Sequence, residues 1–222
     1  MLLAVDSSTK WIGLALFDGV SVHGEMVWKT NNHHTVELAP AIASLMKRCD
    51  ITAKDLKVLA VALGPGSFTS LRIGMAVVKG MSLSLKIPVI GVPTLDILVA
   101  SQPPSELPMA AALQAGRSRY AVMWYKFVKN VWKTQGEARV FRLDELVDKI
   151  TEPTLLCGEF TAEDQESLHG KKKEIILVPP VQSLRRPAYL AHLAWTRWKK
   201  KDVDDVMTLS PIYLHLAGYL PA

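Results

Sequence analysis

The chain has 222 residues, of which 49% are hydrophobic, so it is long enough to bury a core as one large domain or two small ones. Its 26 lysines and arginines against 21 aspartates and glutamates give a net charge of +5, which is compatible with nucleic acid nearby without requiring it. The apolar run 1–5 is shorter than the roughly 7–15 residues of a signal-peptide core. No run approaches the roughly 18–20 apolar residues of a membrane helix, so we expect a soluble, cytoplasmic protein.

The first residues predict three strands followed by a helix. Residues 1–5 and 11–17 are apolar and of strand length, and an Asp-Gly turn leads into a third strand at 20–28. Between residues 35 and 49 apolar side chains recur at helical spacing, and we expect Pro40 near the first turn of this helix. An antiparallel sheet with a polar first turn therefore opens the protein.

Strands and helices then alternate. Residues 57–63 form a nearly continuous apolar run, typical of a strand that is buried on both faces. A long helix is predicted at 67–85, a strand at 89–92 and a helix at 94–100. This order indicates an α/β layer architecture.

A proline-containing segment at residues 102–106 is the clearest boundary in the chain. We therefore predict a first lobe at 1–101, a second lobe at 102–207 and a tail, 208–222, that could pack back on the first lobe. There is no sequence repeat, although a duplicated fold could persist after its sequence similarity has decayed. Beyond the boundary, strands are predicted at 108–114, 119–128, 138–141, 154–157 and 174–178, and helices at 143–150, 161–169 and 187–200.

Two polar segments suit an anion site. Residues 64–69 lie between a buried strand and a helix start, where glycines let the backbone approach a phosphate and free N–H groups point outward. A tight turn with a helix cap and no ligand explains the same residues equally well. Residues 6–9, an aspartate followed by three hydroxyl side chains, could hold Mg²⁺ through water, although a simple Asx or Ser/Thr turn is favoured. The candidate nucleotide- or phosphate-binding residues are Asp6, Ser7, Ser8, Thr9, Gly64, Gly66, Ser67 and Thr69.

Other catalytic signatures are missing from the sequence. Residues 64–69 are not followed by the Gly-Lys-Ser/Thr of a Walker A loop, and their spacing does not fit a nucleophile elbow. Cys49 and Cys157 have no metal-ligand spacing and are expected to be buried as small apolar residues. His33 and His34 are adjacent, so they cannot grip one metal ion from one helix face, and we expect them to be exposed. The basic runs 171–173, 185–186 and 197–201 are expected to be solvated faces in preference to an RNA-binding patch.

The segments 6–9 and 63–74 together resemble the hallmark of the TsaB (YeaZ) family, Asp-Thr/Ser-Ser-Thr followed by Gly-Pro-Gly-Ser-Phe-Thr-Gly-Leu/Val-Arg-Ile-Gly. The pattern continues here at residues 79–80, 86–88 and 91–95. The match is dense over residues 1–99 and faint over 100–222. The resemblance implies an α/β fold of the actin-like ATPase (ASKHA, ribonuclease H-like) type with two lobes.

The resemblance also implies a function. TsaB-like chains pair with a larger paralogue, TsaD, and with the ATPase TsaE, and together these install a threonylcarbamoyl group on N6 of the adenine beside the anticodon in ANN-decoding tRNAs. TsaD carries the catalysis and holds a metal through a His-x-x-x-His helix, which this sequence lacks. We therefore expect a non-catalytic scaffold or dimerisation subunit with no catalytic or metal-binding residue. It would need no cofactor, although weak ATP or ADP binding with Mg²⁺ is conceivable, it could form a homodimer when alone, and it would meet tRNA through the complex.

Three departures from the family pattern argue against nucleotide turnover. Ser70 stands where the family usually has glycine, residues 114–117 replace an Asp-Ala-Arg, and His215 stands where an arginine usually follows Tyr-Leu. An independent actin-like ATPase or phosphotransferase is the alternative. It would need a second phosphate loop in the later lobe, where only isolated glycines occur.

The helix at 67–85 carries two apolar stripes, which need two buried neighbours. The sheet supplies one, and a partner subunit or the rest of the domain supplies the other; we favour a partner. A charge or added bulk at Met75 or Val78 is then expected to abolish the complex without unfolding the chain. The predicted interface residues are Leu38, Ile42, Leu45, Leu71, Ile73, Met75, Val78 and Met81.

Overall fold

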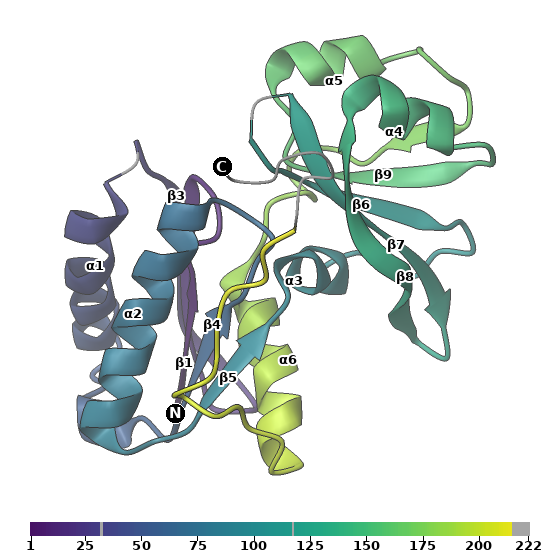
Figure 1. Cartoon of the computed structure of the whole chain (residues 1–222). Helices are drawn as coiled ribbons and strands as arrows, with labels where there is room; N and C mark the ends of the chain where they lie inside the picture. The colour runs from purple at the N-terminus through teal and green to yellow at the C-terminus, as the bar shows by residue number, and fades with distance from the viewer. Residues whose placement is uncertain (32, 117, 215–222) are drawn as a thin grey trace. The chain divides into compact units, whose positions relative to one another are not determined.

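The computed structural model describes residues 1–31, 33–116 and 118–214, which form two compact units (Figure 1). The first unit combines Met1–Ile97 with Arg185–Ile212, and the second begins at Leu98 and runs to Leu184, joined by Tyr213 and Leu214. The first unit is thus discontinuous in sequence, and the predicted lobe 102–207 differs from the structure over residues 185–207. The described part of the predicted tail starts in the first unit, where the Ile212 amide donates to Leu63 O at 2.7 Å. Residues 215–222 lie outside the described residues.

A five-stranded sheet forms the centre of the first unit, with the order β3-β2-β1-β4-β5. The first three strands are antiparallel, as predicted, and β1, β4 and β5 run parallel. Their apolar runs follow from burial on both faces of the sheet. The strands are β1 Leu2–Asp6, β2 Trp11–Phe17, β3 Val22–Lys29, β4 Val58–Ala62 and β5 Val89–Val92.

Helices cover both faces of this sheet. Because side chains alternate along a strand, Leu3 and Val5 pack with helices α1 and α2, whereas Leu2 and Ala4 pack with α6. The helices are α1 His34–Arg48, the short turn η1 Ala53–Asp55, α2 Phe68–Leu85 and α6 Pro187–Lys199, while α3 Thr94–Ala100 contains the passage from the first unit to the second. The prediction for Pro40 is wrong: it lies inside α1, beyond the first turn, on the exposed side. Within the described residues no helix is long and apolar enough to cross a membrane.

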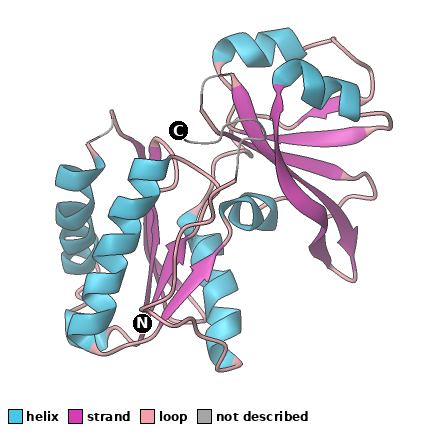
Figure 2. Ribbon diagram, viewed as in Figure 1, coloured by secondary structure: helices cyan, strands magenta, loops and turns pink. Residues whose placement is uncertain are grey.

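The second unit repeats the arrangement of the first. Its sheet has the order β10-β9-β6-β7-β8, in which β6, β9 and β10 are parallel and β6, β7 and β8 are antiparallel (Figure 2). Counted from the first strand of each unit, both sheets read 3-2-1-4-5, so a duplicated fold is present without a sequence repeat. Its elements are β6 Met109–Gln114, β7 Arg119–Val128, β8 Val131–Arg142, α4 Leu143–Lys149, β9 Thr154–Gly158, α5 Ala162–Leu168 and β10 Ile175–Leu177.

Candidate functional site

The two segments predicted to form an anion site lie together at one edge of the first sheet. Asp6 is the last residue of β1, and the loop that follows the parallel strand β4 begins at Leu63. The carboxyl ends of parallel strands meet at one edge, which is where ligands bind in open α/β sheets. The Ser67 amide donates to Ser8 O at 2.7 Å, so the loop and the β1–β2 turn are hydrogen-bonded to each other.

The carboxylate of Asp6 is occupied by the chain itself. Arg185 Nε donates to its Oδ2 at 2.8 Å, and the Ser8 amide donates to its Oδ1 at 2.9 Å. The Ser8 hydroxyl also donates to Oδ1, and Arg185 Nη2 donates to Thr9 Oγ1 at 3.0 Å. The Arg185 and Asp6 side chains are 1% and 3% exposed, so this is a buried ion pair. Both carboxylate oxygens therefore already accept hydrogen bonds from within the chain.

The prediction that Arg185 belongs to a solvated basic face is therefore wrong. The backbone is extended at Arg186, so neighbouring side chains point in opposite directions. Arg186 points outward to the Glu25 carboxylate, whereas Arg185 points into the sheet edge. This proximity to Asp6 is the feature that sequence reasoning missed, because 179 residues separate the two.

Gly66 and Gly74 allow other parts of this chain to pack closely against them. A Cβ on Gly66 would lie 2.1 Å from Ser8 O, and one on Gly74 would lie 2.1 Å from Ser7 Oγ. Real side chains cannot approach so closely. Gly66, which was predicted to let a phosphate approach, thus makes room for the β1–β2 turn, and this is the ligand-free alternative that the sequence left open.

The remaining candidate residues divide between caps and surface. Ser67 caps α2 by accepting from the Ser70 amide at 3.4 Å, and Ser7 Oγ donates to Ser70 O at 2.8 Å. Gly64 is fixed by Thr94, which the sequence reasoning did not select: the Gly64 amide donates to Thr94 Oγ1 at 2.9 Å, and the Thr94 amide donates to Gly64 O at 2.8 Å. The sequence signal that could have identified Thr94 is its position at the start of a predicted helix. Thr69 is exposed.

The histidines and cysteines give no metal centre among the residues that the structure describes. His34 is buried and its Nε2 donates to Thr9 O at 2.8 Å, so the prediction that it is exposed is wrong, whereas His33 is exposed. Cys157 is buried as predicted and Cys49 is partly buried. Burial raises the pKa of the Cys157 thiol to about 11, partly offset by its hydrogen bond with Ser183, so the thiol stays protonated and unreactive near neutrality.

Most of the predicted interface residues lie inside the first unit. Between 0% and 5% of each of these six side chains is exposed, and all are buried in the first unit's core: Leu38, Ile42, Leu45, Leu71, Met75 and Val78. Ile73 and Met81 are partly buried. The predicted effect of a charge at Met75 or Val78 must therefore be corrected, because a charge placed in this core destabilises the fold itself.

The sides of α1 and α2 that point away from the sheet expose mainly small and apolar residues, with the basic residues Lys47 and Arg72 among them. Figure 1 shows the two helices side by side on one face of the sheet, and they contact each other. We call this surface the outer helix face. It consists of Val36, Ala39, Pro40 and Ala43 on α1 and Arg72, Ala76, Gly80 and Leu83 on α2, all exposed.

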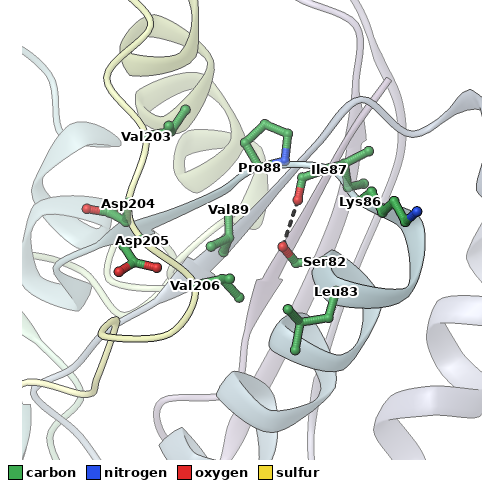
Figure 3. A pocket seen from close by; sticks show the side chains of 10 residues that line it. All are labelled: Ser82, Leu83, Lys86, Ile87, Pro88, Val89, Val203, Asp204, Asp205 and Val206. Carbon is green, nitrogen blue, oxygen red and sulfur yellow. Dashed lines mark hydrogen bonds between the residues drawn. The ribbon is translucent and has the colours of Figure 1, made fainter.

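A shallow pocket of about 410 Å³ lies at the other end of α2, beside the start of β5 (Figure 3). Two of its polar side chains are hydrogen-bonded within the chain: Ser82 Oγ donates to Ile87 O at 2.6 Å, and Asp204 accepts from the Gly91 amide at 2.7 Å. It lies where β5 begins, at the opposite end of the parallel strands from Asp6 and the loop that contains Gly64. The pocket is therefore separate from the candidate site.

Two α/β units with five-stranded sheets of the same strand order define an ASKHA-like fold. Solved structures have the same fold: YeaZ from Pseudomonas aeruginosa is similar at a TM-score of 0.79, with 22% identity and 96% of this chain and 99% of that chain covered. The ethanolamine utilization protein EutJ from Carboxydothermus hydrogenoformans is similar at a TM-score of 0.51, with 12% identity over 86% of this chain and 88% of that chain.

Sequence comparison narrows this class to a family. The family model described as TsaD, tRNA N6-adenosine threonylcarbamoyltransferase, matches residues 28–167. The tRNA threonylcarbamoyladenosine biosynthesis protein TsaB of Bacillus subtilis is 30% identical over 97% of this chain and 94% of that protein. The chain belongs to the TsaB (YeaZ) family of tRNA threonylcarbamoyladenosine biosynthesis, which is related to the TsaD family. The predicted family and fold are confirmed.

Proposed function

We propose that this chain is the non-catalytic scaffold subunit of a bacterial complex that forms N6-threonylcarbamoyladenosine in tRNA. The observation that carries the proposal is the buried pair of Asp6 and Arg185. Asp6 is the carboxylate that the sequence offered as a Mg²⁺ ligand, and in the structure an arginine binds it instead. We accordingly propose that the chain needs no cofactor of its own.

The outer helix face is the proposed binding surface for a TsaD-type paralogue. Small residues one helical turn apart, Ala76 and Gly80, let another helix approach closely, and a Cβ on Gly80 would meet nothing within 4 Å. Val36 and Leu83 are 68% and 55% exposed, which is unfavourable for a surface left in water. A partner with the same fold offers an equivalent helix pair, so a homodimer of the free chain would use the same face. We further propose that the complex includes a TsaE-type ATPase, that this chain meets tRNA through the complex, and that the complex is cytoplasmic.

The function is tested by reconstituting tRNA threonylcarbamoylation from a TsaD-type subunit, a TsaE-type ATPase and the carbamoyl-adenylate synthase, with and without this chain. We expect modification to require the chain, and the chain alone to hydrolyse no ATP. Full modification without the chain would contradict the scaffold function. ATP hydrolysis by the chain alone that is lost in Asp6→Ala would instead favour an independent ATPase or phosphotransferase.

The surface is tested with the double variant Ala76→Glu and Gly80→Glu. We expect it to lose the complex with the TsaD-type subunit in size-exclusion chromatography while keeping the unfolding transition of the unmodified chain. Thr196→Glu is the control for a carboxylate added away from this surface, because residue 196 is exposed on α6, which covers the opposite face of the sheet. A double variant that still binds the TsaD-type subunit would rule out this face.

A further inference from the structure

The strands β7 and β8 extend beyond the rest of the second sheet. Met109, the first residue of β6, pairs with Tyr125 of β7, so the part of the hairpin after Tyr125 has no third strand beside it. Residues 126–133 thus form a two-stranded extension, visible in Figure 1 as the free ends of β7 and β8. We call residues 119–142, which include this extension, the basic ribbon.

Charge on the basic ribbon is almost entirely of one sign. Six exposed basic residues accompany one acidic residue, Glu137: Arg119, Lys126, Lys129, Lys133, Arg139 and Arg142. Arg142 lies 3.3 Å from the Asp144 carboxylate. Within the described part of the chain, Lys126, Lys129 and Lys133 form no salt bridge, so three positive charges at the free end are not neutralised.

The register places like charges directly opposite each other. Arg119 pairs with Arg142, and Lys126 pairs with Lys133. Such pairs are destabilising in an antiparallel ladder. The turn adds a further cost, because Lys129 and Asn130 both have positive φ, 52° and 62°, at positions where glycine, asparagine or aspartate is preferred over lysine. The folded chain thus carries repulsion that a bound polyanion would relieve.

The ribbon is nevertheless held in a defined shape. The ladder skips from Val122 to Trp124 opposite Arg139 and Gln135, a bulge that bends and twists the two strands. The Phe127 and Trp132 rings pack edge to face at 5.3 Å, and Trp132 Nε1 donates to Gln102 O at 3.3 Å. The lysines are therefore presented on a rigid support, which lowers the entropic cost of binding.

We propose that the basic ribbon binds the phosphate backbone of the tRNA substrate, with Lys126, Lys129 and Lys133 as the contacts. This inference rests on the proposed function, which supplies the tRNA. Lysines on an edge strand also prevent sheet-to-sheet aggregation. Both strands are edges in the extension, so Lys126 and Lys133 equally suit that role. It needs charge of either sign, however, whereas the three charges within residues 126–133 are all positive.

The variant Lys126→Glu separates binding from folding. It places a carboxylate opposite Lys133, so we expect a higher urea midpoint for the chain, because a repulsive cross-strand pair becomes attractive. In the reconstituted complex we expect weaker binding of an unmodified tRNA transcript, with a plot of log affinity against log salt less steep by about 1. Unchanged affinity and salt dependence would overturn the proposal.

The triple variant Lys126→Glu, Lys129→Glu and Lys133→Glu keeps a like-charge pair at the same register, so its stability should match that of the unmodified chain. At physiological salt we expect the affinity of its complex for tRNA to fall by at least about tenfold. The control, Lys199→Glu, Lys200→Glu and Lys201→Glu, makes the same change in net charge at the end of α6. Equal weakening in the control would reduce the effect to net charge and overturn the proposal.

The same preparations distinguish the two failures. If modification proceeds without the chain, the proposed function fails. If modification needs the chain but the triple variant binds tRNA normally, the ribbon inference alone fails. If the triple variant no longer binds the TsaD-type subunit, while the complexes that still form bind tRNA with unchanged affinity, the ribbon contacts protein. That outcome would overturn the RNA proposal.

Discussion

At the scale of single residues, the Asp6–Arg185 pair ties the last part of the first unit to the end of its first strand. A buried charge without its partner is costly, so Arg185→Met should lower the free energy of unfolding by about 3–5 kcal/mol. Asp6→Asn should cost a similar amount, because it leaves the Arg185 guanidinium, which cannot lose its proton, buried without a counter-charge. The double variant Asp6→Asn and Arg185→Met should regain most of the lost free energy of unfolding, because the methionine side chain then faces an uncharged amide and no buried charge is left unpaired.

Urea unfolding of the four proteins in this double-mutant cycle measures the coupling. An additive pair of effects would mean that the ion pair contributes nothing specific. The sequence predicted Asp6 as a site residue but not its partner, since sequence patterns are local and Arg185 lies in a run of two arginines that resembles solvated surface. Burial is decided by the alternation at Arg186, which only the fold reveals.

At the scale of elements, α2 carries two glycines with opposite roles, and they form a matched pair of tests. In Gly74→Ala the new methyl group would force Ser7 to rotate away from Ser70 O, breaking a buried hydrogen bond, so we expect a loss of about 1–3 kcal/mol in the free energy of unfolding. In Gly80→Ala the methyl group enters open space, and we expect a gain of about 0.5–1 kcal/mol from helix propensity.

Chemical denaturation of the isolated chain checks both values. Equal changes in the two variants would show that helix propensity alone decides them and that Ser7 does not restrict Gly74. If the outer helix face binds a partner, Gly80→Ala should also weaken the complex although it stabilises the free chain. A glycine with a purely structural role would not combine higher stability of the free chain with weaker partner binding on substitution.

Most element boundaries could be predicted to within one or two residues, because apolar periodicity, glycine and proline set them locally. The exceptions are non-local. The first half of β8, residues 131–137, was missed because its polar sequence shows no strand alternation, and it is a strand through pairing with β7. For α2, periodicity located two apolar stripes but could not say what covers them. The structure buries Met75 and Val78 against the unit's own sheet and α1, so the surface lies on the other side of the helix.

At the scale of the whole molecule, each unit follows one five-stranded plan, but the first is completed by residues that come after the second. Sequence composition marked the linker near residue 102. Prolines also stand at 179, 180 and 187 around Arg185, where the chain returns, but they were not interpreted as a boundary. The α6 helix then covers the sheet face that includes Leu2, Ala15 and Phe17. The lobe predicted from sequence, residues 1–101, therefore lacks one of its two helical layers.

This discontinuity predicts which piece of the chain folds alone. A fragment of residues 1–101 exposes the sheet face that α6 covers, including the contacts of Leu190, Trp195 and Trp198, and removes the Arg185 partner of Asp6. A fully buried large apolar side chain contributes about 1.5–3 kcal/mol, so losing a layer with several such side chains rivals the roughly 5–15 kcal/mol stability of a typical domain. We expect poorly dispersed amide signals in a ¹H–¹⁵N spectrum of this fragment. A protein that joins residues 1–97 to 185–212 through a flexible linker should give dispersed signals and one cooperative unfolding transition. A well-folded 1–101 fragment would show that the α6 layer and the Asp6–Arg185 pair are dispensable for the first unit.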